Sequence, residues 1–74
     1  MNVAKLRPID GRQLAKILCN EFGFSMVRIH GSHATLSKGN TYVTVPLKNI
    51  GIGLLVRILR DAGIGREDFL SVLQ

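Results

Sequence analysis

The sequence predicts an α+β fold in which helices cover one face of a three-stranded antiparallel sheet. Apolar residues recur at helical spacing before Phe22 and again after Gly53, whereas the pattern from 24 to 47 alternates with a period of two. Turn residues at Gly31-Ser32 and at 38–40 divide this alternating segment into three short strands. The expected order is therefore helix, three strands, helix and a short closing helix, with both main helices on the apolar face of the sheet.

The first helix is expected to begin at Asp10, whose carboxylate can accept hydrogen bonds from free backbone amides, and to end at Gly23. Its buried face is formed by Leu14, Ile17, Leu18 and Phe22.

The second and third strands each have an apolar and a polar face. The apolar side chains are Ala34, Leu36, Val43 and Val45, and the polar-face side chains are His33, Thr35, Ser37, Tyr42 and Thr44. Pro46 has no amide to donate, so the third strand is expected to end there or to lie at an edge.

Helical spacing returns after a glycine-rich link at 50–53 and is expected to stop at Gly63. The buried face of this helix is formed by Leu55, Ile58, Leu59 and Ala62. A last helix from Arg66 to about Leu73 is expected to turn Phe69, Leu70 and Leu73 inward.

Length and composition indicate one folded domain over residues 1–74. A chain of 74 residues can enclose one hydrophobic core, and its hydrophobic fraction of 46% is too high for a disordered segment. The single cysteine, Cys19, excludes an intrachain disulfide and fits a reducing cytoplasm, where it is expected to pack as a small apolar residue. No apolar run approaches the roughly 20 residues of a membrane span, so a membrane partner is not expected.

The charge balance favours a nucleic-acid partner. The formal net charge is +5, and no carboxylate occurs between Phe22 and Arg60. This segment contains both histidines and five basic residues, which are Arg28, Lys38, Lys48, Arg57 and Arg60. The alternative is that these charges form a solvated surface that only keeps the protein soluble.

His33 is the main candidate for chemistry, because an imidazole can accept or donate a proton at cellular pH. A base that removes the proton of a ribose 2′-hydroxyl makes that oxygen attack the adjacent phosphate, and Arg28, Lys38 or Lys48 could offset the developing charge. The alternative is that His33 is an exposed histidine without a role.

Other site types receive less support. His30 and His33 together supply two nitrogens, which is too few for a zinc site. The glycines at 51–53 lack the Gly-Lys-Ser/Thr ending of a nucleotide-binding loop. Tyr42 can stack on a base, but one aromatic ring does not form an RNA-stacking platform.

Several motifs together resemble the HicA toxin family. They are Gly23-Phe24, Arg28, Gly31-Ser32-His33, Val43-Thr44-Val45-Pro46, Ile58-Leu59-Arg60-Asp61-Ala62-Gly63-Ile64 and Phe69. The resemblance extends from the first helix nearly to the C-terminus and preserves the order and spacing of the elements.

The resemblance implies a double-stranded-RNA-binding-like fold and endonucleolytic cleavage of messenger RNA without a metal or another cofactor. It also implies a HicB-type antitoxin partner that covers the active face. His33 matches the family's catalytic histidine, and Gly31 and Ser32 match the residues that precede it. RNA contacts are expected from Arg28, Ser32, Lys38 and Lys48.

The chain departs from the family at three positions. Lys48 stands where members often have a histidine, which puts a second proton-transfer group in that loop in doubt. The second helix opens on Leu54-Leu55 in place of a Thr-Leu pair, so Gly53 is expected to be its weak N-cap. Gly65 replaces the usual serine cap of the last helix.

Two further functions remain open from the sequence. A noncatalytic module could hold double-stranded RNA through its shape and phosphates with the same charges. A protein-interaction domain that docks an acidic partner would have no salt-dependent affinity for RNA.

Overall fold

The computed structural model describes residues 5–73 and has the predicted α+β architecture. The elements are β1 (Ile9–Asp10), α1 (Gly11–Glu21), β2 (Ser25–His30), β3 (His33–Lys38), β4 (Thr41–Pro46), β5 (Asn49–Ile50), α2 (Ile52–Ala62) and α3 (Arg66–Ser71). This order is compatible with a double-stranded-RNA-binding-like fold.

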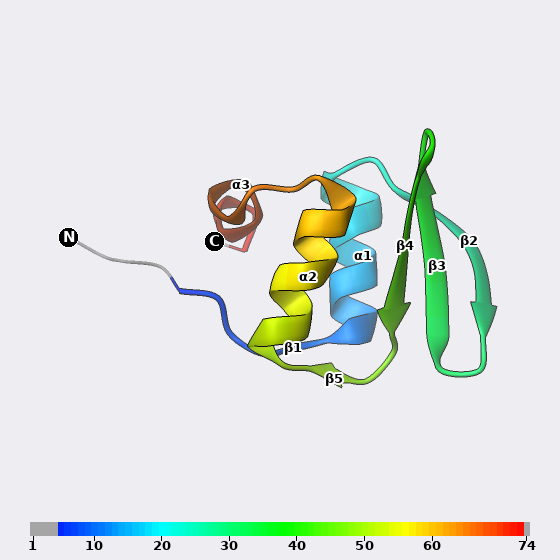
Figure 1. Cartoon of the computed structure of the whole chain (residues 1–74), viewed down its shortest axis with the longest axis horizontal. Helices are drawn as coiled ribbons and strands as arrows, with labels where there is room; N and C mark the ends of the chain where they lie inside the picture. Colours follow the sequence, from blue (N-terminus) through cyan, green and yellow to red (C-terminus); the bar gives the residue numbers. More distant parts are fainter. Residues whose placement is uncertain (1–4, 74) are drawn as a thin grey trace.

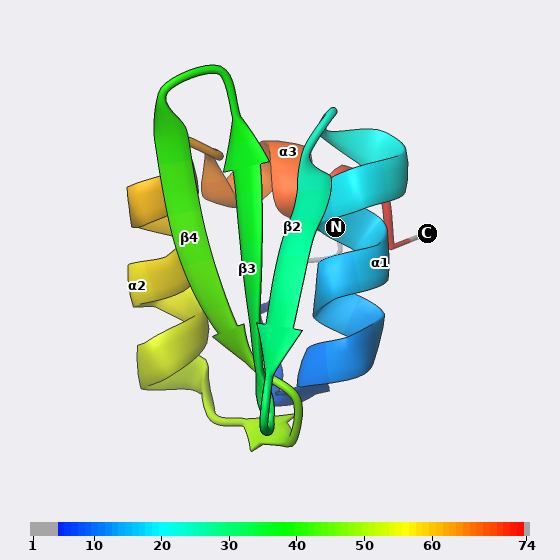
Figure 2. The same cartoon turned by 90° about the vertical axis from the view of Figure 1, so that its right-hand side faces the viewer.

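The main sheet is antiparallel and has the order β2-β3-β4, which leaves β3 in the centre (Figure 2). Two-residue turns join the strands, and each has a glycine with positive φ at its first position, Gly31 (φ 61°) and Gly39 (φ 60°). Glycine at this position is typical of the type II′ turn, which matches the twist of the strands it joins. Strand β4 is an edge strand and ends at Pro46, as the missing amide of proline predicts.

Both main helices lie on one face of this sheet, as predicted. Figure 1 shows α1 and α2 side by side between the sheet and α3, and Figure 2 shows the other sheet face without any covering element. The covered face holds the core, and the open face remains in contact with solvent.

The core combines residues from α1, α2, α3, β3 and β4 with Phe24, which precedes β2, and Ile50 of β5. Its buried residues are Leu14, Ala15, Leu18, Phe24, Ala34, Leu36, Val43, Val45, Ile50, Leu55, Ile58, Leu59 and Phe69. No polar or charged side chain is buried anywhere in residues 5–73. No helix in this same range is long and apolar enough to span a bilayer.

Local hydrogen bonds explain where the helices begin and end. Asp10 accepts a hydrogen bond from the Arg12 amide at 3.1 Å and is the N-cap of α1. Gly63 adopts a left-handed conformation (φ 74°), and the Ile64 amide donates to the Leu59 carbonyl at 2.9 Å, which is the Schellman arrangement at the end of α2.

Two expectations about helix ends were wrong. The N-cap of α2 is Gly51 and not Gly53, because helical geometry begins directly after β5, whose Ile50 pairs with Ile9 of β1. Leu73 does not turn inward: α3 ends at Ser71, so the helical periodicity that buries Phe69 does not extend to Leu73, which is 46% exposed.

A β-bulge makes β2 the least regular strand. Met26 pairs with Leu36 and Arg28 pairs with Thr35, so Val27 is an extra residue without a partner in the register. All six residues of β2 are exposed, although the pairing of Met26 and Ile29 directs both of them to the helix side.

Candidate active site on the open face of the sheet

His33 lies on the open face at the first position of β3. It is exposed, whereas the next residue, Ala34, is completely buried beneath the helices. In the sheet register His33 stands between His30 of β2 and Pro46 of β4. The exposure on the open face that the sequence predicts for this imidazole is therefore confirmed.

Backbone hydrogen bonds hold together the segments around His33. The Leu47 amide donates to the Ser32 carbonyl at 2.6 Å, which joins the β2–β3 turn to the loop after β4. The Gly11 amide donates to the Lys48 carbonyl at 2.7 Å, which joins the same loop to the start of α1. A side chain at residue 11 would overlap the Pro46 carbonyl, so this close approach requires glycine.

Arg28 shares the open face with His33. It is exposed and pairs with Thr35, which lies two residues after His33 on the same face of β3. Arg28 and His33 are therefore diagonal neighbours, whose Cα atoms in a regular ladder are about 7–8 Å apart. A long guanidinium side chain can span that separation.

Ser32 and Lys48 are also at the His33 end of the sheet. Ser32 is exposed in the turn that precedes His33, and Lys48 is exposed in the loop that follows β4. The Leu47–Ser32 hydrogen bond brings these two backbone segments into contact. Three of the four residues expected to contact RNA thus surround the histidine.

Lys38 is separated from this group. It is the last residue of β3, and its register position places it on the same side of the sheet as Ala34 and Leu36. Its ammonium nitrogen is 6.0 Å from the centroid of the Phe24 ring. Lys38 therefore cannot act on a phosphate that contacts His33.

Acidic residues are absent from the three main strands, and most of them lie in the helices. Four of the five carboxylates are in helices: Glu21 in α1, Asp61 in α2, and Glu67 and Asp68 in α3. The fifth, Asp10, lies in β1, where it pairs with Asn49 of β5 and caps α1. The open face consequently has cationic side chains and no carboxylate that would repel a phosphate.

The structure pairs the two histidines directly across the β2–β3 turn. His30 is exposed and stands opposite His33 in the register. No group of three or more metal-ligating side chains occurs among residues 5–73. Sequence reasoning treated this pair only as metal ligands, although the two-residue turn between them already indicated that they face each other.

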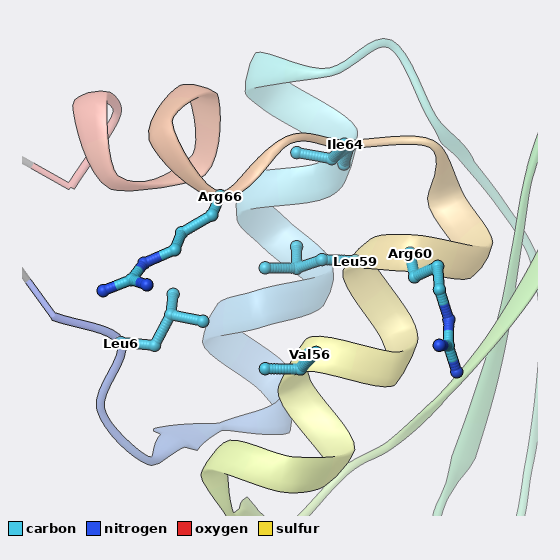
Figure 3. A pocket seen from close by; sticks show the side chains of 6 residues that line it. All are labelled: Leu6, Val56, Leu59, Arg60, Ile64 and Arg66. Atoms are coloured by element: carbon cyan, nitrogen blue, oxygen red, sulfur yellow. The ribbon is translucent and has the colours of Figure 1, made fainter.

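A separate pocket lies on the helical side of the molecule, away from this site (Figure 3). It has a volume of about 390 Å³ and is lined by Leu6, Val56, Leu59, Arg60, Ile64 and Arg66. Figure 3 shows Val56, Leu59 and Ile64 directed into the pocket and the Arg60 guanidinium directed away from it. This pocket contains none of the residues that the sequence predicts to act on RNA.

Comparison with known proteins identifies the family. Residues 11–64 match the family described as HicA toxin of bacterial toxin-antitoxin, a range that begins with α1, includes the whole β2-β3-β4 sheet and ends just after α2. No curated protein and no solved structure matches the chain. Since the family match covers well over half of the 74 residues and contains the Gly31-Ser32-His33 turn, the chain belongs to the HicA family of toxins from bacterial toxin–antitoxin systems.

Proposed function

We propose that this HicA-family chain is an endoribonuclease that cleaves messenger RNA without a metal ion, with His33 as its general base. The main support is the exposed imidazole of His33 on a sheet face that has Arg28 nearby and no carboxylate. An exposed, carboxylate-free sheet surface gives a polyanionic chain access to this imidazole. Because messenger RNA is the proposed substrate, the cytoplasm is the proposed place of action.

In this reaction His33 removes the proton of a ribose 2′-hydroxyl, and the freed oxygen attacks the adjacent phosphorus. The products are a 2′,3′-cyclic phosphate and a 5′-hydroxyl. Arg28 and Lys48 offset the negative charge that develops on the phosphoryl oxygens. Ser32 contacts the same nucleotide, whereas Lys38 contacts the RNA backbone at a more distant phosphate.

A cleavage assay with matched variants tests the proposal. Labelled single-stranded RNA is incubated with chelator and with wild type, His33→Ala or Ser25→Ala, the last being an exposed position at the other end of the hairpin. Wild type and Ser25→Ala are expected to produce cyclic phosphate ends, and His33→Ala is expected to be slower by about 10²–10⁴-fold. Equal cleavage by wild type and His33→Ala would contradict the proposal, and salt-dependent binding without cleavage would indicate a noncatalytic RNA-binding module.

The partner proposed for this toxin is a HicB-type antitoxin that covers the open sheet face. Membership in a toxin–antitoxin family implies a partner of this kind, and the face with His33 is the surface that must be blocked to stop cleavage. Addition of the partner to the same assay should therefore prevent RNA cleavage. A purified complex that cleaves RNA as fast as the free toxin would contradict this mode of neutralisation.

A further inference from the structure

We propose that His30 is the general acid of the reaction and protonates the 5′-oxygen of the leaving nucleotide. This inference rests on the proposed endoribonuclease function, in which His33 is the base. It assigns the second proton transfer, for which a nuclease without a metal ion needs a donor.

The position of His30 in the sheet is the main support for its role as the general acid. His30 and His33 are directly opposite each other in the antiparallel register, on the two sides of the Gly31-Ser32 turn. Directly opposed residues direct their side chains to the same face, with Cβ atoms about 5 Å apart. Both imidazoles are exposed on the open face, so one phosphodiester can contact both of them.

The turn between the histidines is fixed in place. Gly31 adopts a positive φ of 61°, and the Ser32 carbonyl accepts the Leu47 amide at 2.6 Å. This hydrogen bond connects the turn to the edge of the sheet formed by β4. The separation of the two histidines is therefore set by the backbone and not by flexible side chains alone.

An imidazole is better suited to this proton transfer than the other charged or titratable groups of this face, because general acid catalysis is most efficient when the pKa of the donor lies near the operating pH. Arg28 shares the face through its pairing with Thr35, and Lys48 lies in the loop after β4. Guanidinium and ammonium groups hold their protons strongly and act mainly as fixed charges. Tyr42 pairs with Ser37 at the other end of the sheet, and no carboxylate occurs in β2, β3 or β4.

The two imidazoles account for both proton transfers of the reaction. His33 begins neutral and takes the 2′-hydroxyl proton as the bond between the 2′-oxygen and phosphorus forms. His30 begins as an imidazolium and gives its proton to the 5′-oxygen as the bond between phosphorus and that oxygen breaks. Exchange with water then returns both histidines to their starting states.

Chemically modified RNA provides a specific test. The variants are His30→Gln, His33→Gln and the control Ser25→Gln, which changes an exposed residue on the same strand far from the turn. Each is assayed under single-turnover conditions on normal RNA and on RNA with a sulfur in place of the 5′-bridging oxygen. A thiolate leaves without protonation, so this substrate does not need a general acid.

We expect His30→Gln to cleave normal RNA about 10²–10⁴-fold more slowly and to regain nearly the wild-type rate on the sulfur substrate. His33→Gln should remain slow on both substrates, and Ser25→Gln should match the wild type. The pH profile of the wild type should be bell-shaped, and His30→Gln should lose the fall in rate at alkaline pH because the group that must be protonated is absent.

The outcomes separate the two proposals. If wild type cleaves, His33→Gln is inactive and His30→Gln is as fast as wild type, the role of His30 is wrong and the proposed function stands. If His30→Gln is equally slow on both substrates, or loses only RNA affinity, His30 is a binding residue and not the acid. If wild type does not cleave RNA, the proposed function itself is wrong.

Discussion

Gly11 and Gly53 each occupy the first turn of a helix, but their surroundings are opposite. A Cβ atom at residue 11 would overlap the Pro46 carbonyl and lie 3.0 Å from the Lys48 carbonyl oxygen. A Cβ atom at residue 53 would have no neighbour within 4 Å. The same substitution therefore probes close packing at one helix start and backbone entropy at the other.

We predict that Gly11→Ala lowers the free energy of unfolding by about 1–3 kcal/mol, because backbone on both sides of the new methyl group must move. Gly53→Ala should raise it by about 0.5–1 kcal/mol, because alanine restricts the unfolded chain and fits an exposed helical position. Urea denaturation of the two variants and the wild type measures both changes. Equal effects of the two substitutions would contradict the contact between α1 and the loop after β4.

At the residue scale, the sequence predicted the exposure of His33 but not the isolation of Lys38. The alternation of His33 with buried Ala34 is a local pattern that strand geometry fixes. Charge alone groups Lys38 with the residues near His33, although the turn predicted at 38–40 already places it at the far end of the strand. Basic composition alone indicates which residues carry charge and not which of them share a phosphate.

At the element scale, helices α1, α2 and α3 and the three main strands were predicted, whereas the pairing of β1 with β5 and the bulge in β2 were not. Helices α1 and α2 and strands β3 and β4 each have a clear hydrophobic period, because one face of each contributes to the core. The pairing of β1 with β5 involves two residues on each side and has no period. The bulge at Val27 shifts the register within β2, so simple alternation does not give the faces of its residues.

We predict that β2 opens more easily than β3 in the native protein. Strand β2 has one neighbouring strand and no buried side chain, whereas β3 is central and has Ala34 and Leu36 completely buried. Opening β2 therefore exposes little new apolar surface, and opening β3 disrupts the core. Native-state hydrogen exchange should give a lower opening free energy for β2 amides than for β3 amides that pair with β4. Equal protection in both strands would contradict this difference.

At the scale of the whole molecule, charge is distributed unequally between the sheet and the helices. Acidic residues lie in or next to the helices, with two of them in α3, which is on the side of the helix layer opposite the sheet (Figure 1). Residues 22–56 contain three basic side chains, Arg28, Lys38 and Lys48, and no carboxylate, whereas the rest of the chain combines seven basic with five acidic side chains. A polyanion therefore meets no local repulsion from carboxylates along the strands and their loops.

The positions of Arg28, Lys38 and Lys48 predict how RNA binding depends on salt and which of these residues also affect the cleavage rate. If Arg28, Lys38 and Lys48 each neutralise one phosphate, the logarithm of the single-stranded RNA binding constant should fall with the logarithm of salt concentration with a slope of about −2. Each alanine substitution should reduce the steepness of that slope by about 0.7.

The three substitutions should differ in their effect on bound RNA. Lys38 and His33 lie at opposite ends of β3, about 17 Å apart for a strand of that length. Lys38→Ala should therefore weaken binding without changing the single-turnover cleavage rate at saturating protein. Arg28→Ala and Lys48→Ala should lower that rate as well, because their positive charges are close enough to stabilise the transition state. A reduced rate in Lys38→Ala at saturation would mean that the RNA backbone crosses the sheet near Lys38 at the bond that is cut, contrary to a reaction centred on His33.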